Sequence, residues 1–261
     1  MKKLRTVLCG CLILAVLCSS ACTSNDPAEV YPEVAERYTE AAKQNGVKLV
    51  YDRTMKLSDG TRTVTYGMNG EAAFRTGEDD ALLLSQSGDV KIDLNVGSSF
   101  TVPVKSYYCE GKLYSEINES RYVKTMNVID ALTQLGPVCS PLVNLSVSDF
   151  KELTLKDNED DTRTISVMIS AEAIKKIVGL QESWRRIADL GEGEGKIEFQ
   201  DVRGFFVIRD ELPVKQSLTI IGSIKTADRS YSITEEMVLA ISSEEAVTVN
   251  EPAASQYVSL D

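Results

Sequence analysis

Apolar and polar residues alternate along most of the chain beyond residue 46, and this two-residue period predicts β-strands with one buried face and one wet face. The alternation is clearest in Val90-Lys91-Ile92-Asp93-Leu94. Comparable runs lie at 47–57, 64–68, 150–155, 165–169, 197–208, 218–224, 231–241 and 247–249. Turn sequences punctuate the first half of this region: Asp59-Gly60, Asn69-Gly70, Ser87-Gly88, Glu110-Gly111 and Asn118-Glu119. Their spacing of about ten residues indicates an antiparallel meander in which each strand pairs with the one before it.

Three segments instead repeat their apolar residues at helical spacing. The first is expected to have Pro32 in its first turn and to end at Gly46. The second runs over 127–135, with Asn127 as its N-cap. The third and longest runs over 171–190 and carries one apolar stripe.

Together these segments predict an α+β fold that is mainly β. Strands and helices do not alternate, which argues against a parallel, doubly wound sheet. A sheet of about a dozen strands must curl, and its apolar face needs a cover. The helices are the only cover available, so we expect a curled antiparallel sheet, or half-barrel, with about three helices on its concave face. Residues 31–261 are expected to form it as a single domain, in which 197–208 is one strand bent at Gly204.

The chain begins with the features of an export signal. Lys2, Lys3 and Arg5 precede an apolar run at 7–17. That run has the length of a secretory signal and is too short for a comfortable membrane span. We therefore expect residues 1–21 to be a signal peptide.

The residues at the end of this segment, Ala21 and Cys22, resemble the lipobox of bacterial lipoproteins. The resemblance implies that the chain is cut before Cys22 and that diacylglycerol is attached to its thiol, with fatty acyl groups such as palmitate as the anchor. Residues 22–30 would then be the lipidated cysteine and a tether, and the protein would sit on the outer face of the bacterial cytoplasmic membrane. The alternative is a soluble secreted protein cut near Ala21.

Two cysteines remain in the exported domain, Cys109 and Cys139. In an oxidising compartment they could form a disulfide. They could equally be two buried thiols, because free cysteine packs as a small hydrophobic residue.

Composition narrows the function classes. The chain has a formal net charge of −11 and no histidine. The acidic balance argues against nucleic acid as a partner, and the missing histidine excludes Ser-His-Asp and Cys-His catalysis. Acidic turns at 78–80 and 157–161 lack the EF-hand spacing, and 191–196 lacks the strand, helix and Ser/Thr of a phosphate loop. We therefore expect no metal, no cofactor and no enzyme activity.

Several segments resemble the LolA/LolB lipoprotein carriers and their LppX/LprG relatives, a superfamily with many uncharacterised Gram-positive lipoproteins. They are the hairpin 107–114 with 121–124, the run 204–208 with 212–215, and the closing 247–252 with Tyr257. The resemblance covers most of 31–257. It implies a half-barrel whose apolar cavity, in characterised relatives, holds lipid acyl chains.

The stripe on the third helix supplies the candidate ligand cavity: Ile174, Ile177, Val178, Trp184 and Ile187. The same residues could be packed core, which is the commoner role of such a stripe. We expect a lipid-anchored extracytoplasmic protein that binds a lipid or another hydrophobic ligand, as a carrier or sensor. The alternative is a cell-envelope scaffold or protein-interaction module with a filled interior and no ligand; the sequence does not identify a protein partner.

Overall fold

The computed structural model describes residues 24–76, 81–94, 97–135, 144–191, 193–243, 246–249 and 252–260. The helices are α2 (Pro27–Gln44), α3 (Val128–Leu135), α4 (Ala171–Ile174) and α5 (Leu180–Ile187), with short 3₁₀ turns at Val147–Asp149 and Ala254–Gln256. The first strands are β1 (Val47–Ser58), β2 (Thr63–Thr76), β3 (Leu82–Leu94), β4 (Ser98–Cys109), β5 (Lys112–Ile117) and β6 (Ser120–Thr125). The later strands are β7 (Phe150–Asp157), β8 (Arg163–Ile169), β9 (Lys196–Phe199), β10 (Val202–Arg209), β11 (Leu212–Lys225), β12 (Ser230–Ser242) and β13 (Val258–Ser259).

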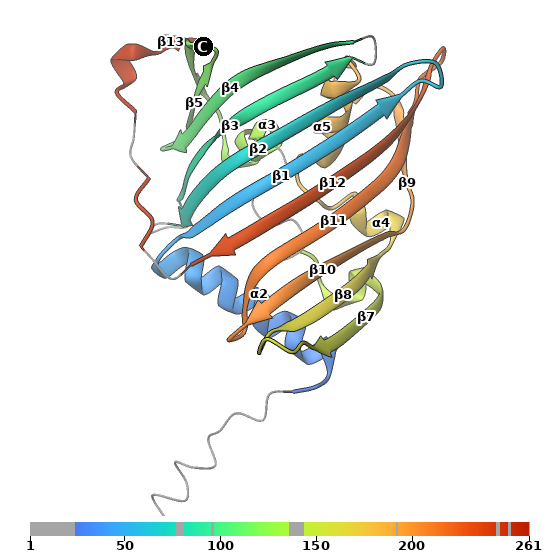
Figure 1. Ribbon diagram of the computed structural model, residues 1–261. Helices are drawn as coiled ribbons and strands as arrows, with labels where there is room; N and C mark the ends of the chain where they lie inside the picture. The colour runs from blue at the N-terminus through green and yellow to red at the C-terminus, as the bar shows by residue number, and fades with distance from the viewer. Residues whose placement is uncertain are drawn as a thin grey trace, which may run out of the picture.

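All of these strands belong to one curled, open sheet (Figure 1). Its order is β13-β6-β5-β4-β3-β2-β1-β12-β11-β10-β8-β7, and β9 pairs with β11 beside this path. Each half of the sheet is a meander, and the pairing of β1 with β12 joins the first long strand to the last. The predicted α+β half-barrel is confirmed.

The helices cover different parts of the sheet. Figure 1 shows α2 lying along one end of the sheet and α3, α4 and α5 lying behind it, on the concave face. Within the described part of the chain, the buried apolar residues form two clusters. Val30 and Val34 of α2 belong to the first cluster, while Tyr38 and Ala42 belong to the second. One amphipathic helix therefore seals the end of both halves of the core.

Two predicted turns are wrong. Asn69-Gly70 and Ser87-Gly88 lie inside the uninterrupted strands β2 and β3, where Gly70 stands opposite Gly88. A methyl group at Gly70 would come within 2.8 Å of the Tyr51 hydroxyl. These glycines serve close packing, because they leave room for the Tyr51 ring to cross from β1 toward β3. Of the other predicted turns, Asp59-Gly60, Glu110-Gly111 and Asn118-Glu119 are confirmed, and each contains at least one residue with positive φ.

Helix boundaries also differ from the prediction. The segment 171–190 is broken into α4 and α5 by residues 175–179. Gly179, at the end of the break, adopts a left-handed conformation (φ +76°) that no α-helix continues through. The first helix begins earlier than expected, at Pro27 with Asp26 as its cap, and Pro32 lies inside it. Helix α2 therefore contains the last residues of the expected tether, from Pro27 onward.

Three strand predictions need correction as well. The run 197–208 is two strands, β9 and β10, which part at residues 200–201. Both pair with β11, over different stretches of it, and β10 also pairs with β8. Residues 247–249 form no strand. The chain instead ends in β13, which lies parallel to β6 and is the exception to the antiparallel rule. The Tyr257 ring packs edge-on against Tyr114 at 5.2 Å, which fastens this last segment to the sheet.

Candidate functional site

One part of the concave face is apolar but only half-covered. It is formed by alternate residues of β2, β3, β4 and β5, which the strand register places side by side. We call it the open apolar face; its residues are Val64, Tyr66, Met68, Val90, Ile92, Leu94, Phe100, Val102, Val104 and Ile117. Most are half-buried, and Phe100 and Ile117 are each 48% exposed. The same face of β1 and β12 is buried almost throughout, so this surface is the part that the described helices leave open.

A pocket of about 290 Å³ lies at the covered end of this face, between the strands and the helices α3 and α5. We call it the inner pocket. Its apolar wall is Met68, Val90, Val104, Leu113, Ile117 and Leu135. Its polar wall is Arg53, Gln86, Ser106, Ser115, Gln134, Ser183 and Arg186. An apolar surface that ends in a few converging polar groups is typical of a site that orients an amphipathic ligand.

Arg53 enters the pocket from the central strand β1. Its Nε donates to Oε1 of Glu235 at 2.6 Å, and one terminal nitrogen donates to the Ser183 hydroxyl at 2.9 Å. The second oxygen of Glu235 accepts a hydrogen bond from the Trp184 indole. The Glu235 side chain is fully buried, whereas that of Arg53 is 12% exposed. The ion pair is therefore anchored on the core side by Glu235, and Arg53 reaches the pocket.

Gln86 on β3 supplies a second polar group. Its Nε2 donates to the Tyr51 hydroxyl at 3.1 Å, while its Oε1 is buried without a hydrogen-bond partner among the described residues. Burial raises the pKa of Tyr51, and the hydrogen bond from Gln86 lowers it in part. Since Gln86 is only 4% exposed, an unmet acceptor there is costly unless a ligand or water supplies a donor.

Arg186 closes the pocket from α5. Its guanidinium donates to the backbone carbonyls of Thr133 (2.7 Å) and Gln134 (3.1 Å) at the end of α3. Burial lowers the pKa of Arg186, the positive charge of Arg53 lowers it further, and Glu182 raises it. Within the described part of the chain, no carboxylate forms an ion pair with Arg186. The pocket thus holds two guanidinium groups and a single buried carboxylate behind them.

The predicted cavity residues lie elsewhere. Ile174, Ile177 and Trp184 are buried in the packed core, and Ile187 packs against it half-buried. Val178 does not share their side of the helix, because the chain breaks beside it and leaves it 44% exposed. None of these five lines the inner pocket. Their role in ligand binding stays a prediction.

Only one of the cysteines predicted to form a covalent site lies among the described residues. Residues 1–21, Cys22 and Cys139 lie outside the described residues, so the signal peptide, the lipid anchor and the disulfide stay predictions. Cys109 is buried at the end of β4. No helix among the described residues combines the length and the apolar character needed to cross a membrane.

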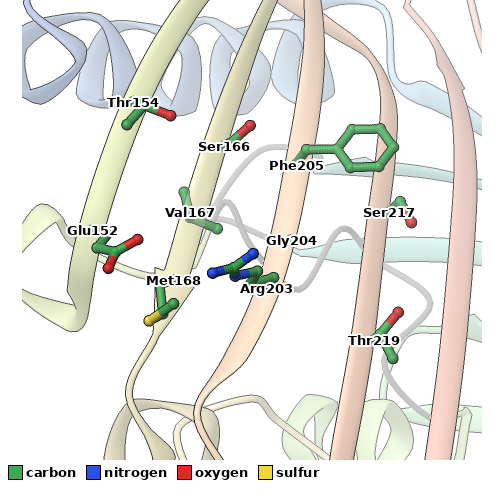
Figure 2. Close-up of a pocket in the computed structure, with 10 residues that line it drawn as sticks. All are labelled: Glu152, Thr154, Ser166, Val167, Met168, Arg203, Gly204, Phe205, Ser217 and Thr219. Carbon is green, nitrogen blue, oxygen red and sulfur yellow. The ribbon is translucent and has the colours of Figure 1, made fainter.

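Two other hollows lie away from the open apolar face. A groove of about 500 Å³ runs over β7, β8, β10 and β11 on the convex face, and Figure 2 shows its labelled side chains spread along the strands. It includes Glu152 and Arg203, and most of its remaining residues are small or hydroxyl-bearing. A further hollow gathers the acidic turns around Asp157 and Asp210. No group of three or more potential metal ligands is present among the described residues.

No protein-family model matches the chain, and no curated protein matches it. A protein of the DUF1329 family from Desulfovibrio piger aligns with 88% of this chain and 97% of its own at 10% identity and a TM-score of 0.32. A putative outer membrane lipoprotein-sorting protein domain from Vibrio parahaemolyticus aligns with 85% of this chain and 95% of its own, at 8% identity and a TM-score of 0.27. A beta-barrel-like DUF1849 protein from Brucella abortus covers 77% and 99%, at 10% identity and a TM-score of 0.18. Scores this low leave the function to be argued from the concave face itself.

Proposed function

We propose that the protein binds the acyl chain of a lipid on its open apolar face, with one end of the ligand in the inner pocket. The observation that carries the proposal is the continuous set of half-buried apolar residues on β2, β3 and β4, next to a pocket with polar groups. A bound chain would remove this surface from water, as a packed helix does elsewhere on the same sheet. The protein would act as a carrier or sensor of a hydrophobic ligand and not as an enzyme.

The size of the pocket favours a single chain. At about 30 Å³ for a water-sized group, 290 Å³ holds about ten such groups. The remainder of a long chain would lie along the open apolar face toward Leu94 and Phe100. Each methylene moved out of water contributes about 0.8 kcal/mol, which is roughly a fourfold gain in affinity per methylene.

The proposed location follows from the N-terminus. A lipid on Cys22 would hold the protein at the outer face of the cytoplasmic membrane, within reach of lipids that leave or enter the bilayer. Helix α2 starts at Pro27, so only a few residues would separate the anchor from the folded domain.

The test measures binding of a neutral fluorescent probe, N-phenyl-1-naphthylamine, and its displacement by alcohols of ten to sixteen carbons. The full chain carries Cys22→Ser, so that no attached lipid competes. Two variants alter the site: Val90→Trp fills the inner pocket, and Val104→Asp places a charge in it. Val50→Asp is the matched control, because Val50 is 57% exposed on the convex face of β1.

We expect displacement to tighten with alcohol length, both site variants to weaken it at least tenfold, and Val50→Asp to bind like the parent chain. Site variants that bind as well as the parent would overturn the placement of the ligand. A parent chain that binds neither probe nor alcohol would overturn the function and favour the scaffold alternative.

A further inference from the structure

We infer that the inner pocket recognises an anionic head group, and that the ligand is a single-chain carboxylate, such as a long-chain fatty acid, held between Arg53 and Arg186. This inference rests on the proposed function and adds to it the class of ligand.

The charges of the side chains at the inner pocket do not cancel. Arg53 has a counter-charge in Glu235, but that carboxylate already accepts from both Arg53 and the Trp184 indole and is fully buried behind them. Arg186 is bonded only to backbone carbonyls in the described structure. Glu182, the nearest acid on the same helix, is hydrogen-bonded to Arg185. The pocket therefore keeps an excess of one positive charge, which one carboxylate would neutralise.

Polar side chains stand on both sides of an apolar pair in the pocket. Gln86, Ser106 and Ser115 stand side by side on β3, β4 and β5 at the covered end. The next inward-facing positions toward the open end, Val104 and Ile117, are apolar and also paired across their strands. Arg53 stands in the following inward row, opposite Met68, so a head group over the apolar pair would have polar side chains on both sides. The buried, unpartnered Oε1 of Gln86 would accept a hydrogen bond from a water that also hydrates the head group.

The charge and the size of the inner pocket favour a carboxylate over a phosphate. A phosphate monoester carries close to two negative charges at neutral pH, and the pocket offers a single uncompensated positive charge. A head group with more than one oxygen-rich substituent would also fill most of the 290 Å³ volume, leaving no room for the chain. Arg186 additionally lines a wider cavity of about 770 Å³ beside α3 and β6.

The experiment compares three ligands of equal chain length, palmitate, hexadecanol and hexadecyl phosphate, in the same displacement assay on the Cys22→Ser chain at pH 8. Arg186→Gln removes the positive charge, and Arg186→Lys keeps it without the forked geometry. Arg203→Gln, on the convex face, is the charge-matched control. Thermal unfolding of each variant is measured alongside, because Arg186 also ties α5 to α3.

We expect palmitate to bind at least tenfold more tightly than hexadecanol, and Arg186→Gln to abolish that preference by weakening palmitate binding far more than hexadecanol binding. Arg186→Lys should restore part of the preference, and Arg203→Gln should leave it intact. Equal binding of palmitate and hexadecanol would overturn the head-group inference while leaving the proposed function in place. Tighter binding of hexadecyl phosphate would overturn the assignment of a carboxylate. Failure of all three ligands would overturn both proposals.

Discussion

Replacing Glu235 with glutamine tests whether the buried ion pair, rather than apolar packing alone, fastens α5 to the sheet. The substitution keeps the size of the side chain and removes its charge. In the parent structure the two carboxylate oxygens accept from two different donors, Nε of Arg53 at 2.6 Å and the Trp184 indole. A glutamine offers one oxygen and one NH₂ group, so one of these donors would face another donor.

The magnitude follows from burial. Removing one partner of a buried ion pair typically costs 3–5 kcal/mol, because the other charge is left without compensation. We expect the lower end, about 3 kcal/mol, since the Arg53 side chain is 12% exposed and borders the inner pocket, where water can hydrate it. For a domain of this size each kcal/mol corresponds to about 2–4 °C in the unfolding midpoint. Glu235→Gln should therefore unfold about 6–12 °C below the parent.

The assay is thermal unfolding followed by tryptophan fluorescence. Trp184 is the only tryptophan of the chain and is completely buried, so its emission reports directly on the docking of α5. Glu236→Gln is the matched control, because Glu236 is the next residue of β12 and is exposed on the convex face. The double variant Arg53→Met with Glu235→Leu removes both charges and should recover most of the lost stability.

Two results would refute this reasoning. One is a Glu235→Gln midpoint within 2 °C of the Glu236→Gln control, with unchanged emission, which would mean that the pair adds little to the docking of α5. The other is a double variant as unstable as Glu235→Gln alone, which would mean that packing, and not the uncompensated charge, sets the cost.

Two further predictions concern stability away from the pocket. A Cβ at Gly222 would lie 2.8 Å from the Trp184 ring, so Gly222→Ala should lower the free energy of unfolding, measured in urea, by about 1–3 kcal/mol. Gly67→Ala is the control, because its new methyl group would meet nothing closer than 3.9 Å, and its free energy of unfolding should stay within about 0.5 kcal/mol of the parent value. The pKa of Asp149 is lowered, first by the hydrogen bond from Lys176 and then by a backbone N–H. A carboxyl whose pKa is depressed on folding stabilises the protein above its unfolded pKa, about 3.9, and this stability is lost as the pH falls through the lower folded value. Asp149→Asn should therefore lose about 1–3 kcal/mol at pH 7 and then lose less than the parent between pH 5 and pH 2, and an unchanged pH dependence in urea unfolding would contradict the assignment.

The meander could be predicted because its turns are local. Glu110-Gly111 and Asn118-Glu119 sit between strands that pair with each other, and their positive φ values are what such short connections require. Gly70 and Gly88 give the same signal in the sequence for another reason. They lie opposite each other in paired strands and make room for Tyr51, which comes from a third strand. Only the tertiary structure distinguishes a glycine that bends the chain from one that admits a neighbour.

The prediction of one long third helix is wrong for a related reason. Its apolar residues recur at helical spacing on both sides of Gly179, so the period continues across a point where the backbone does not. The break brings the Cβ position of Gly179 to 3.0 Å from the backbone of Thr133, in α3. The two short helices α4 and α5 therefore stand where one long helix was expected, and α5 begins where the chain meets α3.

Two charged residues at the pocket could be recognised in the sequence from the strand pattern alone. Arg53 and Glu235 each occupy an inward position in a strand whose other inward positions are apolar, on β1 and β12 respectively. A charge in such a position must find an opposite charge, because its burial alone is too costly. The partner cannot be found by proximity in the chain, since 182 residues separate the two. It follows from the register: Arg53 stands opposite Met237 and Met55 opposite Glu235, which makes the two charges diagonal neighbours on one face. The pairing of β1 with β12 therefore brings together two charged residues that each interrupt an apolar strand face, and this places Arg53 at the pocket.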